Sequence, residues 1–177
     1  MHYPQYDNIE HYPAEQTIGF TSTAAEWGIL SNFAKTPMVV NGVEFACVEQ
    51  LYHYIRLNNA QERAEYLKLT PNMGLKMKAK AFKKRGVERS DWREIAVDVM
   101  RFCLNHKYVN SEAFRKELER SKGKYIVEDE SNRKTKPDSW GAVLDAATGE
   151  YYGKNIMGRL LMELREKEQL EYGEFVW

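Results

Sequence analysis

The chain has 177 residues, in which 26 lysines and arginines balance 26 aspartates and glutamates. Its length predicts a single domain with a sizeable core, and its zero formal net charge argues against a protein that coats DNA, although it allows a local basic pocket for a small anion. No stretch approaches the ~20 apolar residues of a membrane span, and residues 1–15 lack the features of a signal peptide, so we expect a cytoplasmic protein without a membrane partner.

The predicted secondary structure is mixed, with more helix than strand. Residues 1–15 are expected to form a mobile extension, and residues 16–177 a single compact domain. Short strand patterns alternate with apolar residues at helical spacing, and Asn41-Gly42 is a strong two-residue hairpin signal. In chain order, we predict a strand over 16–21, a hairpin over 36–47, helices over 48–59, 61–69, 73–84, 91–108 and 112–122, a strand over 125–128, a surface loop over 129–137 and an aromatic tail over 172–177 that packs on the fold. The predicted fold class is therefore α+β, a mostly helical domain with a small sheet and hairpin.

A glycine-flanked loop precedes the last predicted helix. Gly153 and Gly158 allow a tight turn or a close approach to a ligand, and Asn155 is able to cap the helix or to hydrogen-bond a ligand. The N-terminus of such a helix favours a phosphate or another anion. The alternative is an ordinary capped helix whose apolar face is buried, with Met157, Leu160, Leu161 and Leu164 on that face.

Few side chains suggest a known catalytic or metal site. The P-loop and dinucleotide-binding fingerprints are absent, and the four histidines show no metal-ligand pattern. His53 lies inside a predicted helix and is interpreted as a packed or surface residue. Cys47 and Cys103 are far apart in the sequence and within apolar surroundings, which predicts two buried thiols and neither a disulfide framework nor a metal site.

Three carboxylates lie at predicted helix starts and strand ends or close to an aromatic residue: Glu49, Glu128 and Asp138. Such groups can converge on one pocket, where burial raises a carboxyl pKa and a neighbouring cation lowers it. Two carboxylates beside a stacking ring such as Trp140 suit cleavage of a glycosidic bond through an oxocarbenium-like state. The alternative is that each carboxylate is a solvated cap or surface charge.

Four blocks of sequence, in order between residues 18 and 166, share their spacing with one known family. They are Trp27-Gly28-Ile29-Leu30-Ser31-Asn32-Phe33; Val40 to Phe45 with Val48-Glu49-Gln50-Leu51-Tyr52; Arg89-Ser90-Asp91-Trp92 with Val99-Met100 and Lys107-Tyr108; and Glu128, Asp138 and Trp140-Gly141 with Gly153 to Gly158. These blocks resemble motifs of the NADAR superfamily, such as Gly-x-[Leu/Phe]-Ser-Asn-Phe in the first and Glu-His-Tyr-Phe-Gln in the second. Each block alone is weak, but four in this order are specific.

The resemblance implies a NADAR-like α+β fold and hydrolysis of N-ribosyl bonds. One branch of that family cleaves phosphoribosylated aminopyrimidine intermediates of riboflavin synthesis, and others are linked to ADP-ribose, including its removal from guanine bases. Glu49 is the implied catalytic residue, as a base on the attacking water or a stabiliser of the ribose cation. Glu128 and Asp138 are the implied catalytic partners, which would orient ribose hydroxyls or protonate the leaving group.

The resemblance also implies a set of substrate-binding residues. Trp92 and Trp140 are expected to stack on a base, and Asn32 and Asn155 to donate hydrogen bonds. Arg56, Arg89 and Lys107 are the candidates for binding a phosphate. The full implied set is Gly28, Ser31, Asn32, Arg56, Arg89, Trp92, Lys107, Trp140, Gly141 and Asn155. We expect no metal and no cofactor, because acids, a water and a pocket suffice for this reaction.

The chain departs from the family pattern in the helix that carries Glu49. Where the family has Glu-His-Tyr-Phe-Gln, this chain has Glu49-Gln50-Leu51-Tyr52-His53, and Arg56 stands where a lysine is often found. Because arginine stays protonated, Arg56 suits phosphate binding but not the covalent or proton-transfer chemistry that is open to lysine. The interval from Glu128 to Trp140 is also longer than in the family, and its extra residues, 132–136, are basic.

Two functions fit these features. The first is an N-glycosidase acting on a small phosphoribosyl or ADP-ribosyl substrate, and the second is a non-catalytic module that binds ADP-ribose or a nucleotide. Three acids favour the enzyme, since binding alone has little need of them. The basic stretches 76–85 and 133–136 suggest a further contact with ADP-ribosylated nucleic acid, with a solvated helix face and a solvated loop as the alternative. The sequence leaves the oligomeric state open.

Overall fold

A computed structural model describes residues 3–70, 73–132 and 138–177 of the chain. These residues group into two compact units, each assembled from separate segments. The helical unit, as we name it, comprises residues 32–111 and 170–177, and the sheet unit comprises the described residues of 2–31 and 112–169. Residues 16–177, predicted as one domain, are thus distributed over both units.

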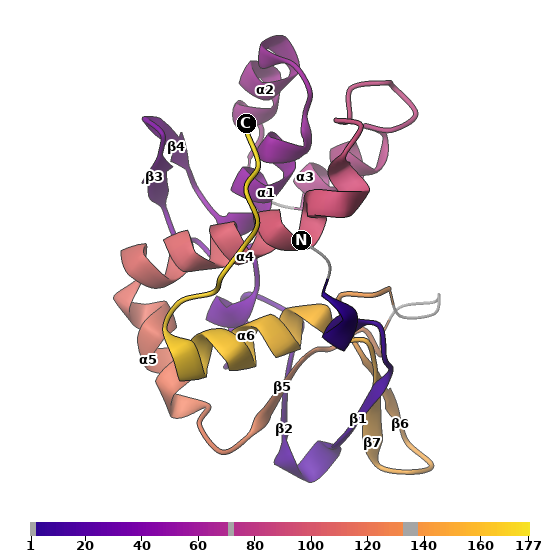
Figure 1. The fold of residues 1–177 in the computed structure, drawn as a ribbon. Helices are drawn as coiled ribbons and strands as arrows, with labels where there is room; N and C mark the ends of the chain where they lie inside the picture. The colour runs from indigo at the N-terminus through magenta and orange to yellow at the C-terminus, as the bar shows by residue number, and fades with distance from the viewer. Residues whose placement is uncertain (1–2, 71–72, 133–137) are drawn as a thin grey trace. The chain divides into compact units, whose positions relative to one another are not determined.

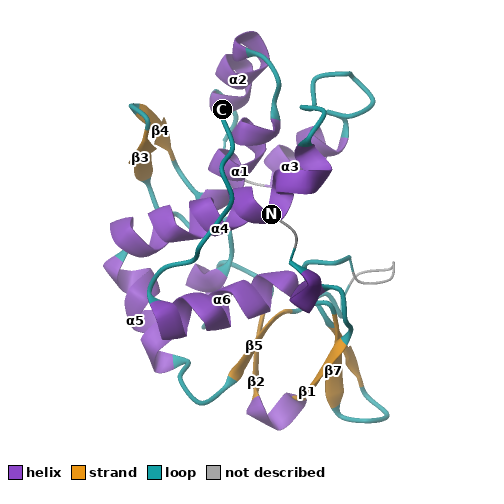
Figure 2. Cartoon of the chain, viewed as in Figure 1, coloured by secondary structure: helices purple, strands orange, loops and turns teal. Residues whose placement is uncertain are grey.

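The helical unit combines a β-hairpin with helices (Figures 1 and 2). Strand β3 (Met38–Val40) pairs antiparallel with β4 (Val43–Phe45), as the sequence predicts. The turn residues Asn41 and Gly42 have positive φ angles of 50° and 78°, which asparagine and glycine adopt more readily than other residues. The helices of this unit are α1 (Val48–Arg56), α2 (Ala60–Leu67), α3 (Met73–Lys80) and α4 (Trp92–Asn110).

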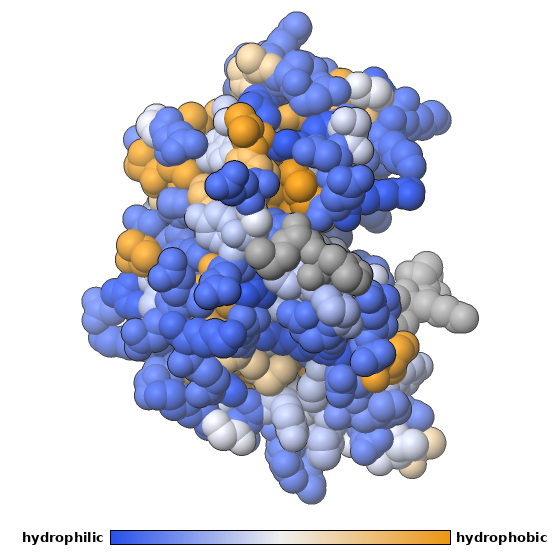
Figure 3. Space-filling view, viewed as in Figure 1, coloured by the Kyte–Doolittle hydropathy of each residue, from blue (hydrophilic) through white to orange (hydrophobic). Residues whose placement is uncertain are grey.

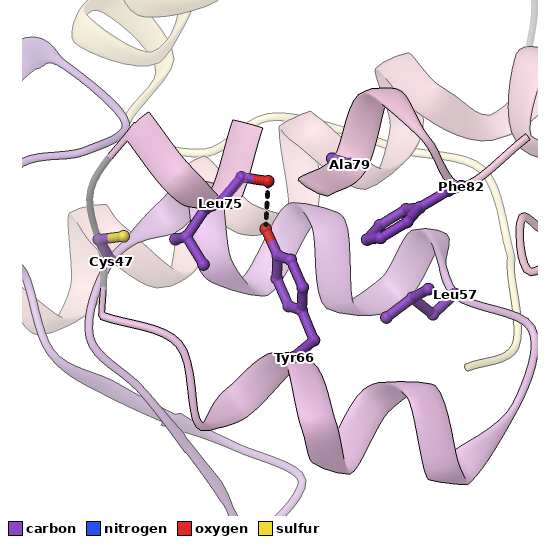
Figure 4. Close-up of a cluster of buried hydrophobic side chains, with 6 residues drawn as sticks. All are labelled: Cys47, Leu57, Tyr66, Leu75, Ala79 and Phe82. Carbon is purple, nitrogen blue, oxygen red and sulfur yellow. Dashed lines mark hydrogen bonds between the residues drawn. The ribbon is translucent and has the colours of Figure 1, made fainter. Parts of the chain in front are cut away.

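A cluster of buried side chains joins α1, α2 and α3 (Figure 4); it contains Cys47, Leu57, Tyr66, Leu75, Ala79 and Phe82. The rings of Tyr66 and Phe82 meet edge to face, with centroids 5.6 Å apart. The Tyr66 hydroxyl donates a hydrogen bond of 3.3 Å to the carbonyl of Leu75. Because a buried hydroxyl without a partner costs free energy, this bond ties α2 to α3 in one arrangement.

The C-terminal residues 170–177 also belong to the helical unit and run along α4 (Figure 1). The side-chain amide of Asn105 donates to the Leu170 carbonyl and accepts from the Leu170 N–H, both at 2.8 Å. At the end of the tail, the Trp177 ring meets the rings of Tyr54 and Phe102 edge to face, at 5.9 and 6.0 Å. The predicted packing of the aromatic tail is therefore confirmed.

The sheet unit contains two small sheets among its described residues. Strands β1 (Glu10–Pro13), β7 (Glu150–Gly153) and β6 (Val143–Asp145) form an antiparallel sheet in that order, while β2 (Thr17–Phe20) pairs in parallel with β5 (Tyr125–Glu128). Helix α6 (Ile156–Lys167) packs on β5 and on helix α5 (Glu112–Arg120). The remaining elements are the short 3-10 turns η1 (Pro4–Tyr6), η2 (Ala14–Gln16) and η3 (Gly28–Leu30).

The N-terminal segment is part of this unit where the structure describes it, whereas the sequence predicts a mobile extension over residues 1–15. Glu10–Pro13 forms β1 against β7. Tyr6 is 5% exposed, and its hydroxyl donates a hydrogen bond of 3.1 Å to Glu163 of α6. The sequence did not predict this strand, because its partner lies far along the chain and the segment has no clear alternation of apolar and polar residues.

The α+β fold class is confirmed, and so are the hairpin and the strands predicted over 16–21 and 125–128. The helices begin close to the predicted residues but end earlier in several cases, since α1 stops at Arg56 and α3 at Lys80. Strands β6 and β7 were not predicted. The loop predicted over 129–137 lies partly outside the described residues.

The face of the molecule in Figure 3 is mainly hydrophilic, with hydrophobic residues in small separate groups. Large exposed hydrophobic side chains include Val39, Met77, Val109 and Val176. Within the described parts of the chain, every helix is too short or too polar to cross a membrane.

Candidate functional site

Glu49 lies in the first turn of α1, at the point where the hairpin leads into the helix. Cys47, the residue before the helix, is extended, with φ −162° and ψ 167°. The Glu49 N–H donates a hydrogen bond of 3.0 Å to the Asn32 carbonyl, which joins two of the predicted site residues through the backbone. A carboxylate at this end of a helix is favoured by the helix dipole. Glu49 is only 7% exposed, so its charge needs specific partners.

His53 supplies such a partner from one turn later on α1. Its Nε2 lies 3.0 Å from Oε1 of Glu49, and His53 is itself 6% exposed. Within the described residues, Nδ1 of His53 is buried and has no hydrogen-bond partner. The sequence interpretation of His53 as a packed or surface residue therefore missed a polar pair. The available signal was the i, i+4 spacing from Glu49, which places both side chains on one helix face.

Asn32 contributes an unused acceptor in the same unit. Its amide nitrogen approaches the Met100 sulfur at 3.5 Å, while its side-chain oxygen is buried without a hydrogen-bond partner among the described residues. The sequence predicts that Asn32 donates a hydrogen bond to substrate. The geometry leaves its oxygen free instead, which suits a ligand that carries a hydroxyl or an N–H.

Lys107, a predicted phosphate-binding residue, is fully buried on α4. Burial lowers the pKa of Lys107 from 10.5 to about 7. The same effect raises the pKa of the nearby Cys47 thiol to about 11, so this thiol is neutral at physiological pH. Lys107 is thus able to exchange a proton near neutral pH, which an exposed phosphate-binding lysine does not do.

Arg56 is the last residue of α1, at the opposite end of the helix from Glu49. Its Nε donates a hydrogen bond of 2.6 Å to Glu88, with which it also forms an ion pair. The guanidinium lies 5.7 Å from the ring centre of Phe82 and 5.5 Å from that of Trp92. Trp92 in turn meets Tyr52 edge to face at 4.8 Å. Arg56 therefore carries a compensated charge held between two aromatic rings.

A pocket of about 340 Å³ opens beside this aromatic wall; it is lined by Lys83, Glu88, Arg89, Ser90, Trp92 and Arg93. Arg89 grips Asp91 with two hydrogen bonds of 2.6 and 2.9 Å, which lower the pKa of Asp91. Three of the lining residues are cationic, and the single lining carboxylate is already paired with Arg56. The pocket therefore suits an anionic group next to a stacking ring.

A larger cavity of about 640 Å³ lies beside the hairpin, with Phe45, Ala46 and Leu67 among its lining residues. The one ionisable residue in its lining is Glu44, an exposed side chain on β4. This cavity lacks the acid–base groups of the α1 face, so we do not assign it to the candidate site.

The glycine-flanked loop before α6 forms a tight junction in the sheet unit. Asn155 is fully buried; its side-chain nitrogen donates 2.8 Å to the Ile126 carbonyl, and its oxygen accepts 3.2 Å from the Glu128 N–H. A Cβ atom on Gly158 would collide with the Ile126 carbonyl oxygen. The prediction that Gly158 allows a close approach is thus confirmed, but the neighbouring group belongs to strand β5 and not to a ligand.

The N-terminus of α6 is not an open anion site, which favours the alternative prediction of an ordinary helix with a buried apolar face. The N–H groups of Ile156 and Met157 donate to the carbonyls of Ser139 and Trp140 at 3.1 and 3.0 Å. Asn155 itself has a left-handed backbone, with φ 48°, and makes no side-chain cap. Backbone carbonyls thus occupy the first donors that a phosphate would need.

The acids of the sheet unit include one that sequence reasoning missed. Glu128 is half-buried at the end of β5, whereas Asp138 is exposed and accepts a hydrogen bond of 2.8 Å from the Trp140 N–H. Glu130 is 2% exposed and accepts 2.8 Å from the Asp138 N–H. Its burial could not be read from the sequence, because Glu130 follows the strand in a segment that resembles a polar loop.

Gly28 and Ser31 of the first block lie around η3 in the sheet unit. A Cβ on Gly28 would collide with the Thr23 carbonyl oxygen, so this glycine is required by backbone packing. Ser31 is 8% exposed, and its N–H donates 3.1 Å to the Gly28 carbonyl. Gly141 also lies close to the backbone of a neighbouring segment, because a Cβ there would lie 2.5 Å from the backbone carbonyl oxygen of Glu128.

The predicted site residues thus fall into two groups, one in each unit. Asn32, Glu49, Arg56, Arg89, Trp92 and Lys107 are in the helical unit, and Gly28, Ser31, Glu128, Asp138, Trp140, Gly141 and Asn155 are in the sheet unit. Their convergence on one pocket stays a prediction. Across the residues that the structure describes, no three histidine, cysteine, aspartate or glutamate side chains gather to hold a metal ion.

Comparison with known proteins places these observations in a family. Residues 19–168 match the model of the NADAR domain. N-glycosidase YbiA of Escherichia coli (strain K12) is 29% identical over 164 residues, which cover 92% of this chain and 95% of that protein. A riboflavin biosynthesis protein of Vibrio vulnificus (strain YJ016) is 24% identical over 172 residues, 96% of this chain and 44% of that protein. The NMR structure of the E. coli protein YbiA is similar, with a TM-score of 0.69 and 29% identity over 86% of this chain and 84% of that chain.

Proposed function

Because the chain belongs to the NADAR domain family, we propose that it is an N-glycosidase that hydrolyses the bond between a phosphorylated ribosyl group and a base or amine. Two relatives carry names that fit this proposal, N-glycosidase and riboflavin biosynthesis protein. The observation that carries it within this chain is Glu49, a buried carboxylate with one oxygen held by His53. Within the described residues, its other oxygen accepts no hydrogen bond from the protein.

The reaction breaks the bond from ribose C1′ to nitrogen and adds water at C1′. In the proposed mechanism, the second oxygen of Glu49 takes a proton from this water as positive charge develops on the ribose. The nitrogen leaves with the bonding electron pair and gains a proton. Glu128 and Asp138 keep their predicted role in orienting ribose hydroxyls or donating that proton.

The basic pocket of the helical unit supports a phosphorylated substrate. Lys83, Arg89 and Arg93 bring cationic groups next to the Trp92 ring, which is able to stack on a planar base. We propose two substrate classes that share this chemistry: an aminopyrimidine ribonucleotide of the riboflavin pathway, and an ADP-ribosylated guanine. The basic residues 76–85 are the proposed contact for a nucleic acid that carries the second substrate.

A product assay on both substrates tests the proposal. One substrate is 5-amino-6-ribosylamino-uracil phosphate, and the other is an oligonucleotide bearing ADP-ribosylated guanine, assayed at increasing salt because phosphate contacts weaken with ionic strength. Release of ribose phosphate or of ADP-ribose supports the corresponding substrate class. Binding of ADP-ribose without turnover of either substrate would replace the enzyme with the alternative, a binding module.

The control for this assay is the variant Glu49→Gln, which keeps the size of the side chain and removes its charge. We expect turnover to fall by about a thousandfold or more, with the circular dichroism spectrum unchanged. Glu44→Gln is the matched variant, because Glu44 is an exposed glutamate in the same unit, and it should retain full activity. Turnover that survives in Glu49→Gln would remove Glu49 from the mechanism.

A further inference from the structure

The side chains of the Glu49–His53 pair are almost completely buried. The side chains of Glu49 and His53 are 9% and 8% exposed, and they meet at 3.0 Å across one turn of α1. A carboxylate in such surroundings stays ionised only where donors replace the lost water. Within the described residues, His53 provides the single side-chain hydrogen bond to this carboxylate.

The unpartnered nitrogen of His53 indicates its protonation state. Nδ1 is buried, and among the described residues it has no hydrogen-bond partner. An imidazolium would bury a second N–H without an acceptor, whereas a neutral ring with its proton on Nε2 buries only a lone pair. The neutral Nε2–H form is therefore favoured, and in this form His53 donates to Glu49.

The charged and titratable groups around the pair leave this donor role to His53. On α1, Arg56 is paired with Glu88. From α2, the Tyr66 ring lies 6.4 Å from His53; burial raises the pKa of Tyr66, and its hydroxyl already donates to Leu75.

Next to α1 and on α4, the Cys47 and Cys103 thiols are neutral, because burial raises the pKa of both and the charge of Glu49 adds to this effect. Lys107, also on α4, has its pKa lowered by burial and interacts electrostatically with Cys47. The other rings that face His53 are Tyr52 at 5.1 Å and Phe82 at 6.3 Å.

We propose that His53 is a positioning residue for Glu49: its Nε2–H holds one carboxylate oxygen, so that the other oxygen is directed at the reacting water. This inference rests on the proposed function, because it concerns the reaction assigned to Glu49. The motif to which the second block is similar has glutamine where this chain has His53. A glutamine side chain offers an N–H donor but no titratable ring, so His53→Gln is the conservative variant.

The first test compares kcat and KM of the wild type, His53→Leu and His53→Gln. Without a donor, the Glu49 carboxylate should lose its fixed orientation, so His53→Leu should lower kcat by about ten- to hundredfold and leave KM nearly unchanged. His53→Gln should recover most of kcat. Loss of thermal stability in both variants with equal losses of kcat would reduce His53 to a structural role and overturn the proposal.

The second test needs no substrate. Imidazole ¹⁵N–¹H correlation spectra of the wild-type protein should show His53 as the Nε2–H tautomer, with shifts that change in Glu49→Gln. A proton on Nδ1 with Nε2 bare would overturn the proposal. The two proposals fail separately: hydrolysis that persists in Glu49→Gln refutes the function, whereas hydrolysis that requires Glu49 but proceeds at the wild-type rate in His53→Leu refutes only the role of His53.

Discussion

The buried polar groups around Glu49 and the buried Asn155 at the junction before α6 are used in different ways. In the helical unit, Glu49, His53 and Asn32 each keep an oxygen or nitrogen that no described protein group engages. In the sheet unit, the buried Asn155 gives both ends of its amide to the backbone of β5. Residues of one implied site set thus serve two purposes, since some retain capacity for a ligand and others hold a helix against a strand. A resemblance in sequence does not separate these purposes, because both constrain residue identity.

The largest expected effect on stability is at the α6 junction. In Gly158→Ala, the new methyl group would collide with the Ile126 carbonyl and approach the Asn155 amide at 2.5 Å. Because backbone cannot move aside cheaply, we expect a loss of about 3–5 kcal/mol in the free energy of unfolding, measured by urea denaturation. Gly149→Ala is the control, since Gly149 has open space and a φ of 71°, and it should cost only about 1 kcal/mol. Similar losses in the two variants would contradict the close approach.

The next prediction concerns Lys107, a fully buried lysine of the helical unit. Lys107 has a pKa of about 7 in the folded state and an ordinary value near 10.4 when unfolded, so above pH 7 the unfolded chain binds the extra proton. The free energy of unfolding of the wild type should therefore rise from pH 7 to about pH 8, where Lys107 contributes a slope of up to about 1.4 kcal/mol per pH unit. In Lys107→Met this contribution should disappear.

Between pH 7 and pH 8, the neighbours of Lys107 contribute less to the slope than Lys107 itself. The Cys47 and Cys103 thiols have raised pKa values in the folded state, so they oppose the trend increasingly above about pH 8, where the thiols of the unfolded chain begin to ionise. The pKa of His106 is lowered by burial, so this residue titrates below this pH range. A wild-type slope that persists in Lys107→Met would show that another group is responsible.

The last prediction concerns the C-terminal tail. Trp177→Ala removes ring contacts with Phe45, Tyr54 and Phe102, and we expect a loss of about 2 kcal/mol in the free energy of unfolding. Val176→Ala is the matched control, because Val176 is 88% exposed, and it should change stability by less than about 0.5 kcal/mol. Equal stability of the two variants would show that the Trp177 ring contacts contribute little to the stability of the helical unit.

Local elements of this protein are readable from its sequence. Asn41-Gly42 predicts the hairpin because these residues accept the positive φ angles that the turn requires. The strand 125–128 and the starts of α1 and α4 follow from apolar spacing and helix-start signals. Glu49, Trp92 and Arg89 are site candidates because they lie in blocks that resemble motifs of the NADAR family, and the spacing of these blocks is visible in the chain.

Other features depend on contacts between distant segments. Strand β1 exists because Glu10–Pro13 meets β7, and no local pattern announces a partner so far along the chain. The burial of Lys107 and Glu130, and the unpartnered nitrogen of His53, follow from everything packed around them. The sequence by itself determined backbone preferences and the family resemblance, since both reside in residue identity and spacing. The tertiary structure alone decided which polar atoms lose water and which of them find a partner, because desolvation is a property of the assembled surroundings.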